Sequence, residues 1–269
     1  MNMPLLSPFT DLEALSWTQK LIGVAVFLQT IELLQLRSKF NETGIWKWST
    51  LQREFQIFPR PVFALLDFLL GYRNFIAVLF LRLIASATVI FFPHPALFLF
   101  LLLSTVLISL RWRGTFNGGS DFMTLIVLMG VSGATVFREI PIVRLACLGY
   151  IAIQTCTSYF IAGFIKMKTS NWRRGKALPG FLNATIHDGN PLLNSISRNR
   201  VICLAASWAV IVFECGFPSA LLNPQLCVVL IGLGFLFHLG TWIIFGLNRF
   251  LFAWMAAYPA LYYCSQLHR

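Results

Sequence analysis

Eight apolar runs, separated by short polar or proline-containing segments, constrain this sequence more than any other feature. Most have roughly the 17–25 residues that a helix needs to cross a bilayer. Hydrophobic residues make up 57% of the chain and charged residues 12%, a far more apolar balance than that of a soluble domain. We therefore expect one all-α, polytopic membrane bundle over residues 1–269, with about eight transmembrane helices at 19–37, 74–92, 96–110, 121–137, 142–166, 201–217, 226–247 and 250–264.

Two segments near the N-terminus fit this scheme less well. Residues 20–36 form a short apolar run that contains Glu32, and residues 62–72 form a half-length run that carries Asp67. The tryptophan-rich residues 37–61 favour an amphipathic segment at the lipid headgroups or, equally, a surface loop. The first residues lack the pattern of a cleaved signal peptide, so we expect the first membrane helix to direct targeting.

The positive charge predicts orientation rather than nucleic-acid binding. The chain has 21 Lys and Arg against 10 Asp and Glu, but no basic stripe typical of a nucleic-acid interface. Residues 38–60 hold four Lys or Arg and residues 166–200 hold seven, whereas 93–95 and 218–225 hold none. The positive-inside rule then places both termini outside and residues 166–200 in the cytoplasm. We expect membrane lipid as a partner and no nucleic acid.

Common catalytic motifs and metal-ligand spacings are absent from the sequence. There is no Walker loop, GxGxxG, HExxH, GxSxG or EF-hand pattern. None of the six cysteines forms a CxxC pair, and all but Cys227 lie well inside apolar runs, where cysteine usually packs as a small hydrophobic side chain. We therefore expect no metal. A transporter is disfavoured because neither half-to-half symmetry nor paired broken helices are visible.

Residues 158–181 hold the strongest candidate for chemistry, because an apolar, aromatic run ends there at Lys166. A lysine at the end of a membrane helix commonly extends to the interface as an anchor, and spacing alone favours that interpretation. A lysine that is instead partly removed from water can lose its proton and act as a base.

Other polar residues fall inside the apolar runs. His238 lies in the middle of a run, where a polar ring needs a partner and can relay protons. Glu214 and Glu32 are acids within runs, and Arg82 is a base within one. A structural ion pair and a functional site fit these three equally well, and the sequence does not decide which acid meets which base.

Asn117 and Asp121 flank a double glycine before the run at 121–137. Capping of that helix by Ser120 or Asp121 is the common role for such residues, and lining the mouth of a cavity is the alternative. The 26 phenylalanines suit an apolar pocket for a lipid or quinone, but they equally suit contact with lipid tails.

Three stretches of the sequence resemble one known family. YFIAGFIKMKTSNWRRG resembles the segment around the catalytic lysine of the vitamin K-dependent gamma-carboxylases, whose membrane part is shared with the bacterial HTTM (horizontally transferred transmembrane) domain. FHLGTWIIFGLNRFLFAWMAAYPALY is similar to the histidine-led helix pair of that family, and FNGGSDFM is weakly similar to its asparagine-containing turn. The resemblance covers most of residues 117–263.

The resemblance implies a quinone-linked oxidative modification of a peptide or small molecule in a bacterial plasma membrane, with a reduced quinone as cofactor. Lys166 matches the base that acts on the quinone, and His238 matches the histidine that leads the later helix. Tyr159 and Trp172 frame the first motif. We take Lys166 and His238 as catalytic candidates. The candidates for binding a substrate or cofactor are Asn117, Asp121, Tyr159, Trp172 and Glu214.

The sequence departs from the carboxylase pattern in several places. Gly119 stands where the carboxylase turn has a histidine tied to carboxylation, and one extra residue separates Lys166 from Trp172. The large soluble domain has no counterpart, and the carboxylase works on the lumenal side of its membrane. Quinone-linked chemistry therefore fits better than carboxylation. The alternative is a non-catalytic membrane partner or maturation factor for a small peptide, in which residues 166–200 dock the partner.

Overall fold

A computed structural model describes residues 9–111, 119–183 and 191–267, which fold into helices without any strand. Eight helices of 17 residues or more form the bundle within these ranges. They are α1 (Asp11–Gln35), α4 (Tyr72–Phe91), α5 (Pro95–Arg111), α6 (Ser120–Val136), α7 (Pro141–Lys168), α11 (Arg200–Gly216), α12 (Pro224–Phe245) and α13 (Asn248–Ser265), and α11 continues into the 3₁₀ turn η4 (Phe217–Leu221).

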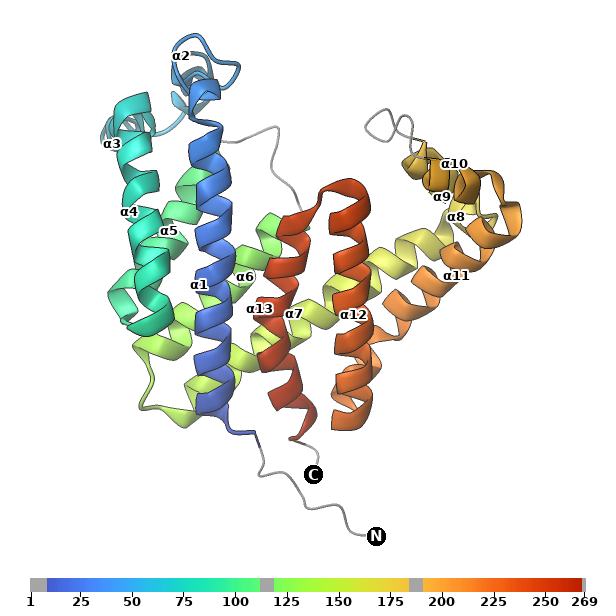
Figure 1. Cartoon of the computed structure of the whole chain (residues 1–269). Helices are drawn as coiled ribbons and strands as arrows, with labels where there is room; N and C mark the ends of the chain where they lie inside the picture. The colour runs from blue at the N-terminus through green and yellow to red at the C-terminus, as the bar shows by residue number, and fades with distance from the viewer. Residues whose placement is uncertain (1–8, 112–118, 184–190, 268–269) are drawn as a thin grey trace.

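Shorter helices lie between the long ones at one end of the bundle (Figure 1). In chain order they are η1 (Arg37–Lys39), α2 (Trp48–Leu51), η2 (Gln52–Phe55), α3 (Arg60–Leu70), α8 (Ser170–Arg173), α9 (Ala177–Leu182) and α10 (Pro191–Arg198).

The long helix α7 crosses the bundle diagonally and connects its two halves (Figure 1). The neighbouring helices α1 and α13 stand in front of it, α4 and α5 lie on one flank, and α11 and α12 lie on the other. Helix α7 packs against α6, α11 and α13, while α1 packs chiefly against α13 and α4. Both ends of the described chain lie at the same end of the bundle, where Phe9 N donates to Gln266 Oε1 at 3.2 Å.

A tight turn at Gly246 joins α12 and α13. Gly246 has a left-handed backbone conformation, with φ of 68°, and its N–H donates to the last carbonyls of α12, which a helix would otherwise leave unsatisfied. His238 lies eight residues before this glycine and Trp254 lies eight residues after it. Because the two helices run in opposite directions from the turn, these two side chains reach the same depth in the bundle.

The surface of the long helices is apolar, whereas polar groups lie inside. Four helices are long and apolar enough to cross a membrane: Tyr72–Phe91, Pro141–Lys168, Arg200–Leu221 and Pro224–Phe245. Their outward side chains include Ile84, Val212 and Ile243, which are 64–74% exposed. An apolar exterior around a polar interior is the distribution expected of a protein in lipid, where internal groups must satisfy one another.

A helix occupies each of the eight ranges in which the sequence predicts a span. Four of these helices meet the length and hydropathy of a membrane span, and the crossing of α1, α5, α6 and α13 stays a prediction. The half-length run at 62–72 forms the separate 11-residue helix α3. Trp48, in the segment that the sequence predicts to lie at the headgroups or in a surface loop, is buried with Phe40 and Phe55 in a small aromatic cluster beside α3.

Arg82 shows how the interior holds charge without water. Its side chain is fully buried in α4, and the described contacts of its guanidinium are to neutral groups. Helices α1 and α5 supply these acceptors: Thr30 Oγ1 at 3.0 Å, Gln29 Oε1 at 2.8 Å, Leu101 O at 3.1 Å, Ser104 Oγ at 3.0 Å and Thr105 Oγ1 at 2.6 Å. This arginine therefore ties α1, α4 and α5 together.

Helices α7 and α11 approach each other closely at Gly163. A Cβ at this position would lie 2.7 Å from Cys215 N and 2.8 Å from Glu214 Cβ. We therefore expect Gly163→Ala to push α11 away and to destabilise the protein by about 1–3 kcal/mol. The midpoint of thermal unfolding in detergent measures this effect. Gly149→Ala on the same helix is the matched control, since a Cβ there has no heavy atom within 4 Å; equal midpoints for the two variants would contradict the close packing.

Candidate functional site

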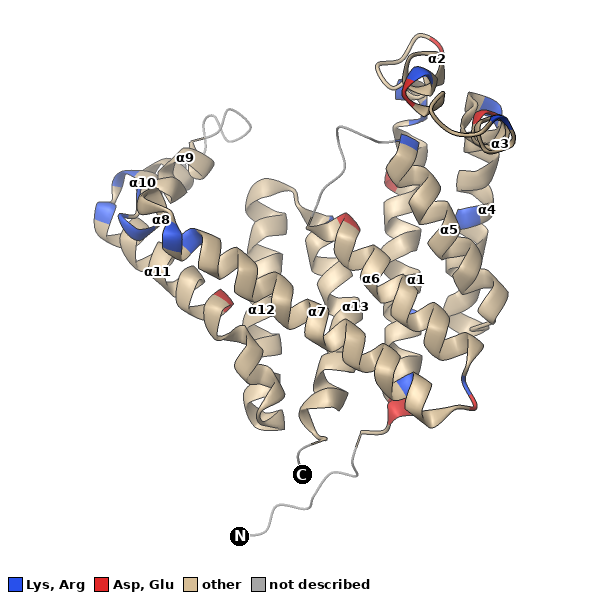
Figure 2. Cartoon of the chain, turned by 180° about the vertical axis from the view of Figure 1, so that it is seen from behind, with Lys and Arg blue, Asp and Glu red and all other residues tan. Residues whose placement is uncertain are grey.

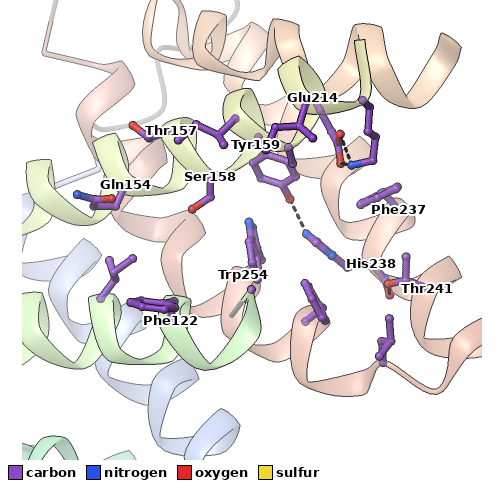
Figure 3. A pocket seen from close by; sticks show the side chains of 18 residues that line it. Phe122, Gln154, Thr157, Ser158, Tyr159, Glu214, Phe237, His238, Thr241 and Trp254 are labelled. Carbon is purple, nitrogen blue, oxygen red and sulfur yellow. Dashed lines mark hydrogen bonds and ion pairs between the residues drawn. The ribbon is translucent and has the colours of Figure 1, made fainter. Parts of the chain in front are cut away.

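A cavity of about 670 Å³ lies between α7 and the helices α6, α12 and α13. One face of α7 forms its longest wall, because Ser158, Ala162 and Lys166 follow one another at four-residue intervals along the helix. The remaining lining is largely aromatic and aliphatic, and Figure 3 shows these side chains from close by. The volume lies within the range of small-molecule sites in proteins.

Lys166 and Glu214 form an ion pair at one end of the cavity (Figure 3). Lys166 Nζ donates to both carboxylate oxygens, at 2.8 and 2.6 Å. The side chain of Glu214 is 4% exposed and that of Lys166 is 19% exposed. The Lys166 ammonium also lies 5.3 Å from the centre of the Trp172 ring. Lys166 is thus held inward by an acid and a ring rather than extended freely to the interface.

A second group of polar side chains, from α7, α12 and α13, forms a hydrogen-bonded chain beside this pair. Tyr159 Oη lies 2.7 Å from His238 Nε2 and 2.9 Å from Tyr258 Oη, and all three residues are at most 6% exposed. The Tyr159 ring stacks on Phe217 with centroids 3.8 Å apart, which fixes its orientation. Within the described chain, the other ring nitrogen of His238, Nδ1, has no hydrogen-bond partner.

The structure brings together four of the predicted site residues. Lys166, Glu214, His238 and Tyr159 all line the cavity, although they come from α7, α11 and α12. Trp172 is outside the lining, but its ring contacts the Lys166 ammonium. The pairing of Lys166 with Glu214 joins residues 48 positions apart, which the sequence left undecided.

The other two predicted site residues are Asn117 and Asp121. Asn117 lies outside the described residues. Asp121 is not the N-cap of α6, because the helix begins at Ser120 and Gly119 is the capping residue. Asp121 does not line the cavity either: it accepts from Gln29 Nε2 at 3.1 Å and lies 3.7 Å from Arg249 Nη1. It therefore belongs to the polar interior around α1.

The remaining intramembrane acid also pairs away from the cavity. Glu32 accepts from Arg249 Nε at 2.7 Å and from the Asn248 side chain. It links the top of α1 to the start of α13, so its role in the structure is to join helices.

Sequence analysis missed several polar residues of the site, among them Gln154, Ser158, Trp254 and Tyr258. A signal for Ser158 was present, since it precedes Lys166 by eight residues, two steps of four along the same side of the helix. Gln154, 12 residues before Lys166, lies about 120° away around a helix of 3.6 residues per turn. No comparable spacing on α13 points to Trp254, which reaches the cavity only through the packing of α13 on α7. In the described ranges, no group of three or more His, Cys, Asp or Glu is placed to hold a metal.

Basic side chains concentrate at the end of the molecule where Lys166 lies. Figure 2 shows Lys and Arg on α8, α10 and α11 and around α2 and α3, with few at the opposite end. This distribution matches the loop charges counted from the sequence. The placement of this end in the cytoplasm stays a prediction.

The apolar exterior, the spanning helices and the internal ion pairs define an integral membrane protein of the all-α class. The family model of the HTTM domain matches residues 136–266, just under half of the chain. Over these residues the chain matches the HTTM family, as the sequence resemblance implied, and an HTTM domain implies a membrane protein of a carboxylase-related family. No curated protein and no solved structure matched the chain.

The Lys166–Glu214 contact predicts strong energetic coupling between the two residues. Removing one partner leaves the other poorly solvated, so each of Lys166→Met and Glu214→Gln should be destabilising, by up to about 3–5 kcal/mol for a buried pair. Lys166→Met should cost more, because Glu214 is the less exposed partner. The double variant should cost less than the sum, by about 1–3 kcal/mol. Unfolding of all four proteins measures this; additive effects would show that the pair is not coupled.

Proposed function

We propose that this protein is a membrane enzyme whose cavity binds a reduced quinone or a similar lipid-soluble hydroxyaromatic molecule, with Lys166 as the base that takes a proton from it. The observation that carries this proposal is that the Lys166–Glu214 pair and the His238–Tyr159 hydrogen bond open onto one largely apolar cavity. Plain helix anchoring of Lys166 would require neither a buried acid nor a cavity beside it.

The cavity residues fit such a ligand. Phe122, Phe237 and Phe250 supply flat apolar surface, and about 670 Å³ is enough for a fused aromatic ring with part of a lipid tail. His238 Nδ1, which lacks a partner in the described chain, belongs to a cavity-lining ring. A reduced quinone, when bound, supplies a hydroxyl that must lose its proton before the ring can be oxidised.

Lys166 and Glu214 together provide the proton acceptor. At 2.6 Å, the ammonium and the carboxylate share a hydrogen bond along which a proton can transfer to Glu214, leaving a neutral amine. That amine can then accept the ligand's proton, and the resulting ammonium balances the negative oxygen. The pair keeps a net charge of zero before the reaction, which suits an apolar site.

His238, Tyr159 and Tyr258 form a hydrogen-bonded group, of which His238 and Tyr159 line the cavity wall that would contact the ligand. The hydroxyl of Tyr159 is shared between His238 Nε2 and Tyr258 Oη, so the imidazole is held in place and its tautomer is coupled to the hydroxyl chain. A proton arriving at His238 can therefore be passed inward to Tyr159. This is the relay role expected for a histidine inside a membrane span.

In this proposal the substrate that is oxidatively modified is a peptide or small molecule, as the family resemblance implies. The exposed Arg173, Arg174 and Lys176 lie at the same end as Lys166 and suit an acidic partner (Figure 2). The resemblance to a bacterial domain favours a bacterial plasma membrane as the location.

Replacing Lys166 tests the proposal directly. Purified wild type, in nanodiscs, should retain a quinone that extraction and mass spectrometry identify. With dissolved O₂ as the two-electron acceptor, it should also oxidise an added short-chain menaquinol faster than empty nanodiscs do, followed by the absorbance of the quinone. Lys166→Met should slow this oxidation by about 10²–10⁴-fold, the usual loss on removing a general base. Lys168→Met is the matched control, because Lys168 lies two residues on and packs over Phe164, outside the cavity lining.

Equal oxidation rates for wild type and Lys166→Met would overturn the enzyme proposal. In that case a cell-based assay compares Lys166→Arg with charge reversal at Arg173, Arg174 and Lys176. Loss of function only on charge reversal would favour the non-catalytic peptide partner, since docking needs the exposed charges and not the amine.

A further inference from the structure

Trp254 has a buried donor that the proposed mechanism does not use. Its side chain, on α13, lines the cavity and is 5% exposed. The indole stacks on Phe250 with centroids 5.4 Å apart, and lies 4.9 Å from the His238 ring. Among the described residues, Nε1 has no hydrogen-bond partner. A buried indole N–H is normally hydrogen-bonded, so this one is an unsatisfied donor that a bound ligand could pair with.

Ser158 faces the same space from α7. Its half-buried hydroxyl lines the cavity and has no hydrogen-bond partner within the described ranges, whereas Thr155 on the same helix donates to Ile151 O at 2.7 Å. Figure 3 shows Ser158 above Trp254, with the indole nitrogen at the edge of the ring that faces α7. In this view the two polar groups, from different helices, lie on one part of the cavity lining.

This part of the cavity is separate from the Lys166–Glu214 pair. Ser158 precedes Lys166 by eight residues on α7, which places the two about 12 Å apart along the helix axis. In Figure 3 the His238–Tyr159 hydrogen bond lies between Ser158 and Glu214, the partner of Lys166. Gln154, one further turn from Lys166, extends the polar surface in the same direction. The cavity therefore has two polar ends, separated by the His238–Tyr159 pair and by aromatic side chains.

We propose that Trp254 Nε1 and Ser158 Oγ form a second polar subsite, which binds a carbonyl or hydroxyl oxygen of an apolar ligand at its end remote from Lys166. An indole N–H can only donate, so it selects a ligand atom that accepts. The inference rests on the proposed function in sharing its cavity, but it concerns recognition and does not require Lys166 to act as a base.

A purely structural role for the same N–H is the competing explanation. The Trp254 and Tyr159 rings are 6.0 Å apart at 70°, so the indole edge can point at the face of the tyrosine ring. In that case the N–H would contribute to packing and not to ligand binding. The two explanations differ in what Trp254→Phe does, because phenylalanine keeps an aromatic ring against Phe250 and removes the donor.

Paired probes separate these explanations. Equilibrium dialysis of the protein in nanodiscs measures binding of 2-methyl-1,4-naphthoquinone and of 2-methylnaphthalene, which has the same ring system without the oxygens; empty nanodiscs correct for partition into lipid. Wild type should prefer the quinone. Trp254→Phe should weaken quinone binding by about three- to tenfold, the value of one neutral hydrogen bond, and leave naphthalene binding unchanged. Ser158→Ala should act in the same direction.

Trp242→Phe is the matched control, since Trp242 is on α12 outside the cavity lining and is 40% exposed. The subsite is refuted if wild type shows no preference for the quinone, if Trp254→Phe keeps that preference, or if it weakens both probes equally. None of these outcomes contradicts the proposed function, which is tested separately by comparing menaquinol oxidation in wild type and Lys166→Met. Conversely, equal oxidation rates in those two proteins would overturn the enzyme proposal but would not change the preference of wild type for the quinone probe.

Discussion

A charge inside an apolar bundle has no water to stabilise it, and the arrangement of this protein depends on that constraint. Lipid tails are as apolar as leucine side chains, so burial of apolar surface does little to hold membrane helices together, and packing and internal polar contacts do more. Arg82 joins three helices through neutral acceptors, and Glu32 joins α1 to α13 through Arg249. The Lys166–Glu214 pair joins α7 to α11 in the same way, but it stands beside a cavity.

The position of that pair gives it a different character from Arg82. Around Arg82 the contacts are closed on all sides by protein, since the side chain has no exposed surface. Lys166 retains 19% of its side-chain exposure and faces space large enough for a ligand. The same physical rule that locks one cation in place therefore leaves the other paired but accessible, which is the condition for a group that must exchange a proton.

Much of the fold could be predicted from sequence, because the length of an apolar run depends on local composition. The positions of α7 and α12, and with them Lys166 and His238, follow from such runs. The ion-pair partners of these residues do not follow from local composition. Glu214 contacts Lys166 across 48 residues of sequence, and either acid could have paired with either base. The contacts of Asp121 with Gln29 and Arg249 could not be predicted, because a helix-start motif carries no information on the packing of α1 beside it. Trp254 was missed because its place in the cavity depends on how α13 packs against α7.

The walls of the cavity do not all come from the same part of the chain. Its ionisable and hydrogen-bonding groups, on α7, α11, α12 and α13, lie within the segment that matches the HTTM family, whereas Phe122 and Ile126 on α6 precede it. The polar groups of the cavity thus all come from the matched segment, while part of its apolar outline comes from outside it. Substitutions at Phe122 and Ile126 on α6 can therefore change the outline of the cavity while Lys166, Glu214 and His238 stay where they are, so the shape of this space can vary independently of its polar groups.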